Sequence, residues 1–91
     1  MDMGGELMDE RLGPVHPGEV LREEYLKPMG LNEDDLAAAL GLNPATVYAL
    51  THHKISITPD IALRLAEYFK TSTRLWLGLQ SEYLSDIERA E

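Results

Sequence analysis

The sequence predicts an all-α domain of five short helices. Apolar residues recur at helical spacing from residue 20 to residue 87, and no useful stretch alternates as a β-strand does. Asn, Ser, Thr or Pro stands at each expected helix start. The 91 residues allow one small domain, and the lack of cysteine excludes disulfides, so the helices must be stabilised by packing.

The first helix is expected to begin at Pro17, because a proline in the first helical turn loses no hydrogen bond. Its apolar positions follow at helical spacing, and Pro28 is expected to end it, with Gly30 completing the turn. The stretch before it has no periodicity and contains adjacent glycines. We therefore predict residues 1–15 as a flexible acidic leader and residues 16–91 as the folded domain.

The next two helices are expected at 33–40 and 44–50, capped by Asn32 and Asn43. Gly41 is a plausible C-terminal residue for the earlier helix, and Pro44 suits the first turn of the later one. Two short helices around a glycine-containing turn are typical of a helix-turn-helix, whose second helix enters the DNA major groove. From the pattern alone, a helical hairpin that only builds the core is an equally good interpretation.

Two further helices complete the predicted domain. Thr58, Pro59 and Asp60 indicate the start of a helix that ends near residue 69. Its inward residues are expected to be Ile61, Leu63, Leu65, Ala66 and Phe69. A last helix, capped by Ser72 or Thr71, carries an apolar stripe from residue 75 to residue 87.

The charge is unusual for a DNA-binding domain. The chain holds 8 Lys and Arg against 16 Asp and Glu, a net charge of −8, whereas most such domains have a basic face. Only the segment 50–74 is net positive. The sequence has no secretory signal and no apolar run near the roughly 18 residues that span a bilayer. We therefore expect a cytoplasmic protein that has no membrane partner.

The residue patterns give no support for catalysis. No catalytic triad order, nucleophile elbow or phosphate-binding glycine loop is present, so we expect no enzyme activity. The adjacent His52 and His53 raise the question of a metal site. With His16 as the only other histidine and no ligand spacing, two solvated loop histidines are the better interpretation, and we expect neither metal nor cofactor.

Three motifs resemble one family. HPGEVLREEYL at 16–26, ITPDIALRLA at 57–66, and the stretch from TS at 71–72 to WLGLQ at 76–80 are similar to HigA-family antitoxins, also called plasmid-maintenance antidote or virulence-associated protein I. The resemblance runs from about residue 16 to residue 83. It implies a five-helix lambda-repressor-like (XRE) fold, a homodimer, operator DNA as a partner, and a HigB-like mRNA-cleaving toxin as the other.

The resemblance also implies which residues face DNA. They lie at the starts of the second and third helices, along the third helix, and in the loop after it: Asn32, Asn43, Ala45, Thr46, Tyr48, Ala49, His52 and Lys54. The sequence departs from the family here, because Pro44, Ala45 and Ala49 cannot make the bidentate base contacts of Arg, Asn or Gln. Glu33 stands where relatives often carry Gln, and its charge is expected to repel a phosphate.

Two further predictions concern the rest of the molecule. His53 replaces the family's usual glycine, so we expect it to adopt a left-handed conformation. The dimer interface is predicted on the last helix, at Leu75, Trp76, Leu79 and Tyr83. The acidic charge and the Ala/Pro recognition face keep a second function open, a toxin-neutralising interaction module with little or no DNA binding.

Overall fold

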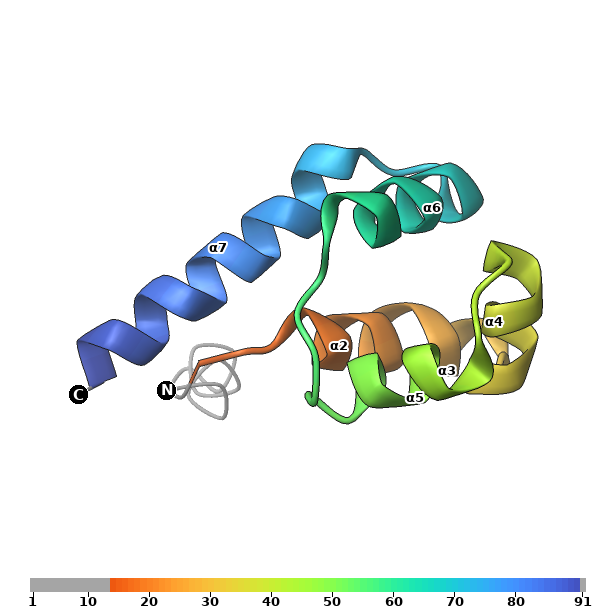
Figure 1. Ribbon diagram of the computed structural model, residues 1–91, viewed down its shortest axis with the longest axis horizontal. Helices are drawn as coiled ribbons and strands as arrows, with labels where there is room; N and C mark the ends of the chain where they lie inside the picture. Colours follow the sequence, from red (N-terminus) through yellow and green to blue (C-terminus); the bar gives the residue numbers. More distant parts are fainter. Residues whose placement is uncertain (1–13, 91) are drawn as a thin grey trace, which may run out of the picture.

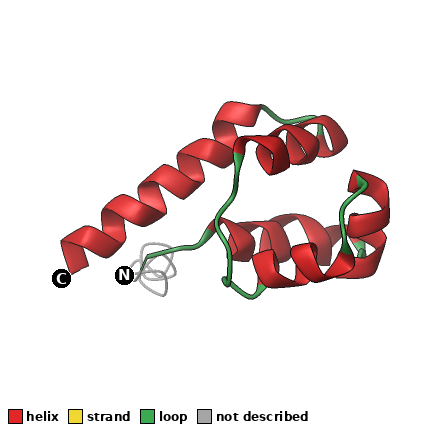
Figure 2. Ribbon diagram, in the orientation of Figure 1, coloured by secondary structure: helices red, strands yellow, loops and turns green. Residues whose placement is uncertain are grey.

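The computed structural model describes residues 14–90, which form five helices and no strand (Figures 1 and 2). The first helix is continuous and has three segments, α2 (Pro17–Val20), η1 (Leu21–Leu26) and α3 (Lys27–Met29). It is followed by α4 (Glu33–Leu40), α5 (Pro44–Thr51), α6 (Pro59–Phe69) and α7 (Thr73–Ala90). The all-α prediction is confirmed. The predicted leader lies outside the described residues up to residue 13, and its flexibility stays a prediction.

The predicted capping residues begin and end the helices as expected. The side chains of Asn32, Thr58 and Ser72 accept hydrogen bonds from backbone N–H groups three residues later, at 2.7, 3.2 and 3.0 Å. Gly41 closes α4 with a φ of 71°, in the left-handed region that glycine adopts without strain. These local signals position α4 and α5 on either side of a tight turn.

Pro28 does not end the first helix, contrary to the sequence prediction. The helix continues to Met29, and Gly30 ends it with a φ of 68°. A proline ring in an α-helix clashes with the carbonyl four residues earlier. The preceding segment has π geometry, in which the Lys27 N–H donates to the Arg22 carbonyl five residues back. The wider turn accommodates the proline, so the helix gains its last residues.

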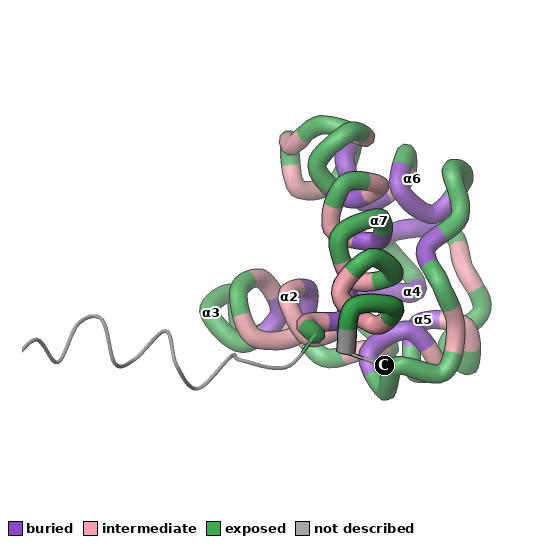
Figure 3. Tube along the Cα trace, turned by 90° about the vertical axis from the view of Figure 1, so that its left-hand side faces the viewer, coloured by how far each residue is buried: buried purple, intermediate pink, exposed green. Residues whose placement is uncertain are grey.

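The core lies where the helices face one another (Figure 3). Trp76 at its centre is 0% exposed, its ring lies near those of Tyr25 and Phe69, and its Nε1 donates to Thr71 Oγ1 at 2.9 Å. The prediction that Trp76 contributes to a dimer interface is therefore wrong, because its own domain encloses it. The expectation that Leu63 points inward is also wrong, since this residue is 48% exposed.

The first helix and α5 approach each other so closely that only glycine fits at position 18. A Cβ atom on Gly18 would overlap the backbone carbonyl oxygen of Leu50, and that carbonyl lies in the last turn of α5. One turn further along the first helix, Arg22 Nη1 donates to the carbonyl oxygen of Thr51 at 2.6 Å. Backbone packing and a charged hydrogen bond therefore join the two helices at the same end of α5.

His16 joins three parts of the chain just before the first helix. Its Nδ1 accepts from the Gly18 N–H at 2.9 Å, and its ring stacks on His53 and meets the edge of Tyr83 on α7, with both ring centroids 4.8 Å away. The side chain is buried. Burial, followed by the charge of His53, lowers the pKa of His16, against a hydrogen bond with the Ile55 backbone that raises it. The fold therefore favours neutral His16.

The close contact at Gly18 predicts a large cost for Gly18→Ala. Alanine normally favours a helix over glycine, but here its methyl group must push apart two backbones, and we expect about 1–3 kcal/mol of lost unfolding free energy. Gly78→Ala is the matched control, because a Cβ at this α7 position meets nothing within 4 Å. It should gain about 0.5–1 kcal/mol. Urea denaturation measures both, and a wild-type midpoint for Gly18→Ala would contradict the packing.

The lowered pKa of His16 predicts acid sensitivity. The native state binds this proton less readily than the unfolded chain, so the histidine's contribution is full above pH 6.5 and is lost as pH falls toward the folded pKa. We expect the unfolding free energy to fall between pH 7.5 and pH 5.5. His16→Asn retains an oxygen that can cap Gly18 and removes the titrating ring, so this fall should shrink. An equal fall in the variant would assign the acid sensitivity to other groups.

Candidate nucleic-acid interface

The helices α4 and α5 form a helix-turn-helix with one buried side and one exposed side. Val47 and Leu50 on α5 are buried in the core, as are Leu36 and Leu40 on α4. On the opposite side of α5, Ala45 and Tyr48 are exposed. We call this side, together with the starts of both helices and the loop 52–54, the outer face of the helix-turn-helix. A helix presented in this way is free to enter a DNA groove.

Both asparagines predicted to contact DNA lie at helix starts on the outer face, and both are exposed. Asn32 Oδ1 accepts from the Asp35 N–H at 2.7 Å, and Asn43 Oδ1 accepts from the Ala45 N–H at 2.8 Å. Each side chain therefore uses its oxygen as a helix cap. The amide NH₂ groups, with two donors each, remain available to a phosphate oxygen.

The remaining predicted residues also lie at the surface, with different exposures. His52 and Lys54 are exposed, Tyr48 is 56% exposed, and Thr46 and Ala49 are half-buried. The structure brings Tyr48 and His52 together, since their rings stack with centroids 3.8 Å apart. His53 has a φ of 63°, which confirms the predicted left-handed conformation. The loop thus turns sharply between the recognition helix α5 and Lys54.

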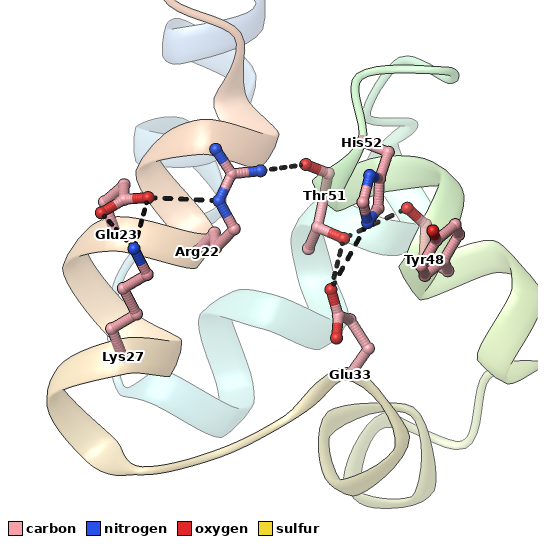
Figure 4. A network of polar contacts seen from close by, with 7 residues as sticks. All are labelled: Arg22, Glu23, Lys27, Glu33, Tyr48, Thr51 and His52. Carbon is pink, nitrogen blue, oxygen red and sulfur yellow. Dashed lines mark hydrogen bonds and ion pairs between the residues drawn. The ribbon is translucent and has the colours of Figure 1, made fainter.

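Glu33 is held by α5 and does not simply extend toward solvent (Figure 4). Its Oε2 accepts from Thr51 Oγ1 at 2.9 Å and lies 3.9 Å from His52 Nε2. Thr51 Oγ1 is also 3.1 Å from the carbonyl oxygen of Tyr48, so its single proton is shared between two acceptors. The carboxylate therefore has polar partners on the recognition helix. The charge of Glu33 was evident from the sequence, whereas these contacts were not predicted.

Two arginines cap the C-termini of the helix-turn-helix, and neither role was predicted from the sequence. Arg22 donates to the Thr51 carbonyl at the end of α5, and Arg64 Nη1 donates to the Leu40 carbonyl at the end of α4, at 2.7 Å. A cation at a helix C-terminus is favoured by the dipole and satisfies a carbonyl without an intrahelical partner. Because the partners are 24 to 29 residues apart, no local spacing could reveal them.

Ion pairing leaves few free cations. Arg22 and Lys27 pair with Glu23, Arg64 pairs with Asp60, and Arg89 pairs with Asp86. Across residues 14–90, the cationic side chains without a carboxylate partner are Lys54, Lys70 and Arg74. Lys54 belongs to the outer face, whereas Lys70 ends α6 and Arg74 lies on α7. The free positive charge of the outer face is therefore concentrated at Lys54.

Neither a metal-ligand cluster nor a membrane-spanning helix occurs among residues 14–90. Within the described part of the chain, no three His, Cys, Asp or Glu side chains come together in a way that could hold a metal ion. Over those residues, no helix combines the length and the apolar character that crossing a bilayer requires.

Comparisons with known proteins match this architecture. A family model described as helix-turn-helix matches residues 23–76. Virulence-associated protein I of Dichelobacter nodosus is 47% identical over 77 residues, 85% of this chain and 69% of that protein. Antitoxin HigA-1 of Vibrio cholerae is 36% identical over 67 residues, 74% of this chain and 63% of that protein.

A solved structure agrees in both fold and sequence. Pseudomonas aeruginosa antitoxin HigA, solved with the higBA promoter, superposes with a TM-score of 0.82 and 40% identity, covering 85% of this chain and 84% of that one. Such identity over most of both chains is a family relationship as well as a shared fold. The chain therefore belongs to the helix-turn-helix family of HigA antitoxins and virulence-associated protein I.

Proposed function

We propose that the protein is an antitoxin that binds operator DNA as a homodimer, represses its own toxin–antitoxin operon and neutralises a HigB-like mRNA-cleaving toxin. The observation that carries the DNA-binding part is the outer face itself. On this face, the capped starts of α4 and α5 present free side-chain amide donors beside the exposed side of the recognition helix. The chain is also 40% identical to an antitoxin solved with promoter DNA.

The proposed DNA contacts follow from the chemistry of the outer face. The side-chain amides of Asn32 and Asn43 donate to phosphates and set the register. The recognition helix enters the major groove, where the methyl group of Ala45 can contact a thymine and the hydroxyls of Thr46 and Tyr48 can contact base edges. Lys54 neutralises one phosphate. The low number of free cations predicts a shallow dependence of binding on salt.

A homodimer is proposed because an operator read by two protomers needs them on one side of the duplex, with recognition helices about 34 Å apart. The support on this chain is the last helix. Leu75 is 38% exposed, and Leu79 and Tyr83, one and two turns further along the same side of α7, are half-buried. With Trp76 assigned to the core, we keep Leu75, Leu79 and Tyr83 as the proposed interface.

The toxin is the proposed second partner. The net charge of −8 favours rapid association with a basic, RNA-binding ribonuclease. One observation also favours the alternative, a toxin-binding module with little DNA affinity: α4 begins with three acids, Glu33, Asp34 and Asp35. The two functions differ in whether the protein binds its own promoter.

A gel shift with the protein's own promoter at several salt concentrations tests the proposal. Specific binding is expected, and Lys54→Ala should weaken it on all sequences and lower the salt slope by about 1. Lys70→Ala is the matched control, because it removes the same charge from the α6–α7 turn, away from the outer face (Figure 1). The salt dependence of binding should have the same slope for Lys70→Ala as for wild type.

The outcomes separate the alternatives. No preference of the wild-type protein for its promoter would favour the toxin-binding module. Specific binding with equal slopes for wild type and Lys54→Ala would keep the DNA-binding function and remove Lys54 from the contact surface.

The interface is tested by Leu75→Glu. The new charge should convert the dimer into a monomer with unchanged helix content, because this side chain is exposed within its own domain. Leu63→Glu is the control, an equally drastic change at an exposed leucine on α6. Light scattering and far-UV circular dichroism measure both. A dimeric Leu75→Glu protein would contradict the α7 interface, and a monomeric Leu63→Glu protein would move it to α6.

A further inference from the structure

The exposed side of the recognition helix carries one large polar side chain among small ones. Tyr48 is 56% exposed, and the neighbouring positions on that side are alanines, Ala45 and Ala49. Its hydroxyl has no hydrogen-bond partner among residues 14–90. Of the other two hydroxyl residues of α5, Thr46 is half-buried, and Thr51 is buried with its hydroxyl bonded inside the domain. The Tyr48 hydroxyl is therefore the group best placed to reach a base edge from this helix.

An exposed tyrosine on a helix normally samples several rotamers, and fixing one of them on binding costs free energy. Here the ring already has a partner. His52, which follows the last residue of α5, stacks on it at a centroid distance of 3.8 Å and an interplanar angle of 29°. The stack holds the tyrosine ring before any DNA arrives. It can do so only as long as the imidazole itself is held.

Glu33 supplies that restraint from a different helix. Its Oε2 lies 3.9 Å from His52 Nε2, which is too long for a hydrogen bond and within the range of an ion pair with the protonated imidazole. The same oxygen is fixed by the Thr51 hydroxyl at 2.9 Å, and the backbone of Thr51 is held by Arg22. The contacts thus run from the first helix and α4 through Thr51 and His52 to Tyr48 (Figure 4).

We propose that Tyr48 determines base specificity and that Glu33 is a positioning residue, which holds His52 and through it the Tyr48 ring. This assignment rests on the proposed DNA-binding function and specifies how the same outer face reads sequence. It explains an acidic side chain at the start of α4, where the charge alone opposes DNA binding. The negative charge of Glu33 lowers the affinity for any DNA, whereas its effect on His52 and Tyr48 raises the ratio of operator affinity to non-operator affinity.

The charge effect and the positioning effect are separable, because α4 offers a matched control. Asp34 is the next residue, it is exposed, and its side chain makes no hydrogen bond or ion pair within residues 14–90. Glu33→Gln and Asp34→Asn each remove one negative charge from the first turn of α4. Both should tighten binding to any duplex by a similar factor. Only Glu33→Gln should release His52.

The experiment measures the affinity of each protein for its own promoter duplex and for a non-operator duplex of equal length, by fluorescence anisotropy at one salt concentration. We expect Asp34→Asn to keep the wild-type ratio of the two affinities. Glu33→Gln should lower that ratio roughly 2- to 10-fold, the factor associated with immobilising one side chain. Tyr48→Phe retains the stack and removes the hydroxyl, and it should lower the ratio by a similar factor.

Coupling between the two residues is the sharper readout. If Glu33 acts through Tyr48, the double variant Glu33→Gln/Tyr48→Phe should lose no more discrimination than Tyr48→Phe alone. In the free protein, the NMR signals of the Tyr48 and His52 rings should shift in Glu33→Gln and stay in place in Asp34→Asn. A residue with a merely structural role would not produce this pattern.

Three results would overturn the assignment. The first is an unchanged ratio in Tyr48→Phe, and the second is an equal ratio in Glu33→Gln and Asp34→Asn. In both cases the wild-type protein still prefers its promoter, so the proposed function stands while the positioning role falls. The third is a wild-type protein without any preference, which would remove the proposed function and this assignment together.

Discussion

The contact between the backbone of Gly18 and the carbonyl oxygen of Leu50 determines how the recognition helix is held. No side chain separates the first helix from the end of α5, and Arg22 adds a charged hydrogen bond to Thr51 beside it. His16 caps the first helix and packs on the loop that follows α5. The buried side of α5 is thus fixed from its C-terminal end, and its outer face is left free for DNA.

The outer face of this acidic chain carries few free cations. Most described cations are used inside the domain, where Arg22 and Arg64 cap the C-termini of α5 and α4. In the proposed complex, phosphate contacts therefore depend on neutral donors, the side-chain amides of Asn32 and Asn43, together with Lys54. Such a surface has weak general attraction to nucleic acid, so discrimination must come from a small number of well-placed groups.

Local signals were sufficient to predict the helices, because caps such as Asn32 and turn residues such as Gly41 act within a few positions. The same periodicity could not distinguish core residues from interface residues, and for this reason Trp76 was assigned to the interface although it lies in the core. It also could not show that a π turn accommodates Pro28. The family resemblance assigned the DNA-facing residues, and their DNA contacts stay a prediction. The contacts of Glu33 could not be predicted, because they join residues 18 or more positions apart.

The central claim is that the outer face of the helix-turn-helix contacts DNA. The most direct measurement is the shift of backbone amide NMR signals when a ¹⁵N-labelled protein is titrated with its own promoter duplex. The account predicts the largest shifts at the first turns of α4 and α5, along the exposed side of α5, and at residues 52–54. Shifts confined to α6 and α7, with the first turns of α4 and α5 unaffected, would contradict it.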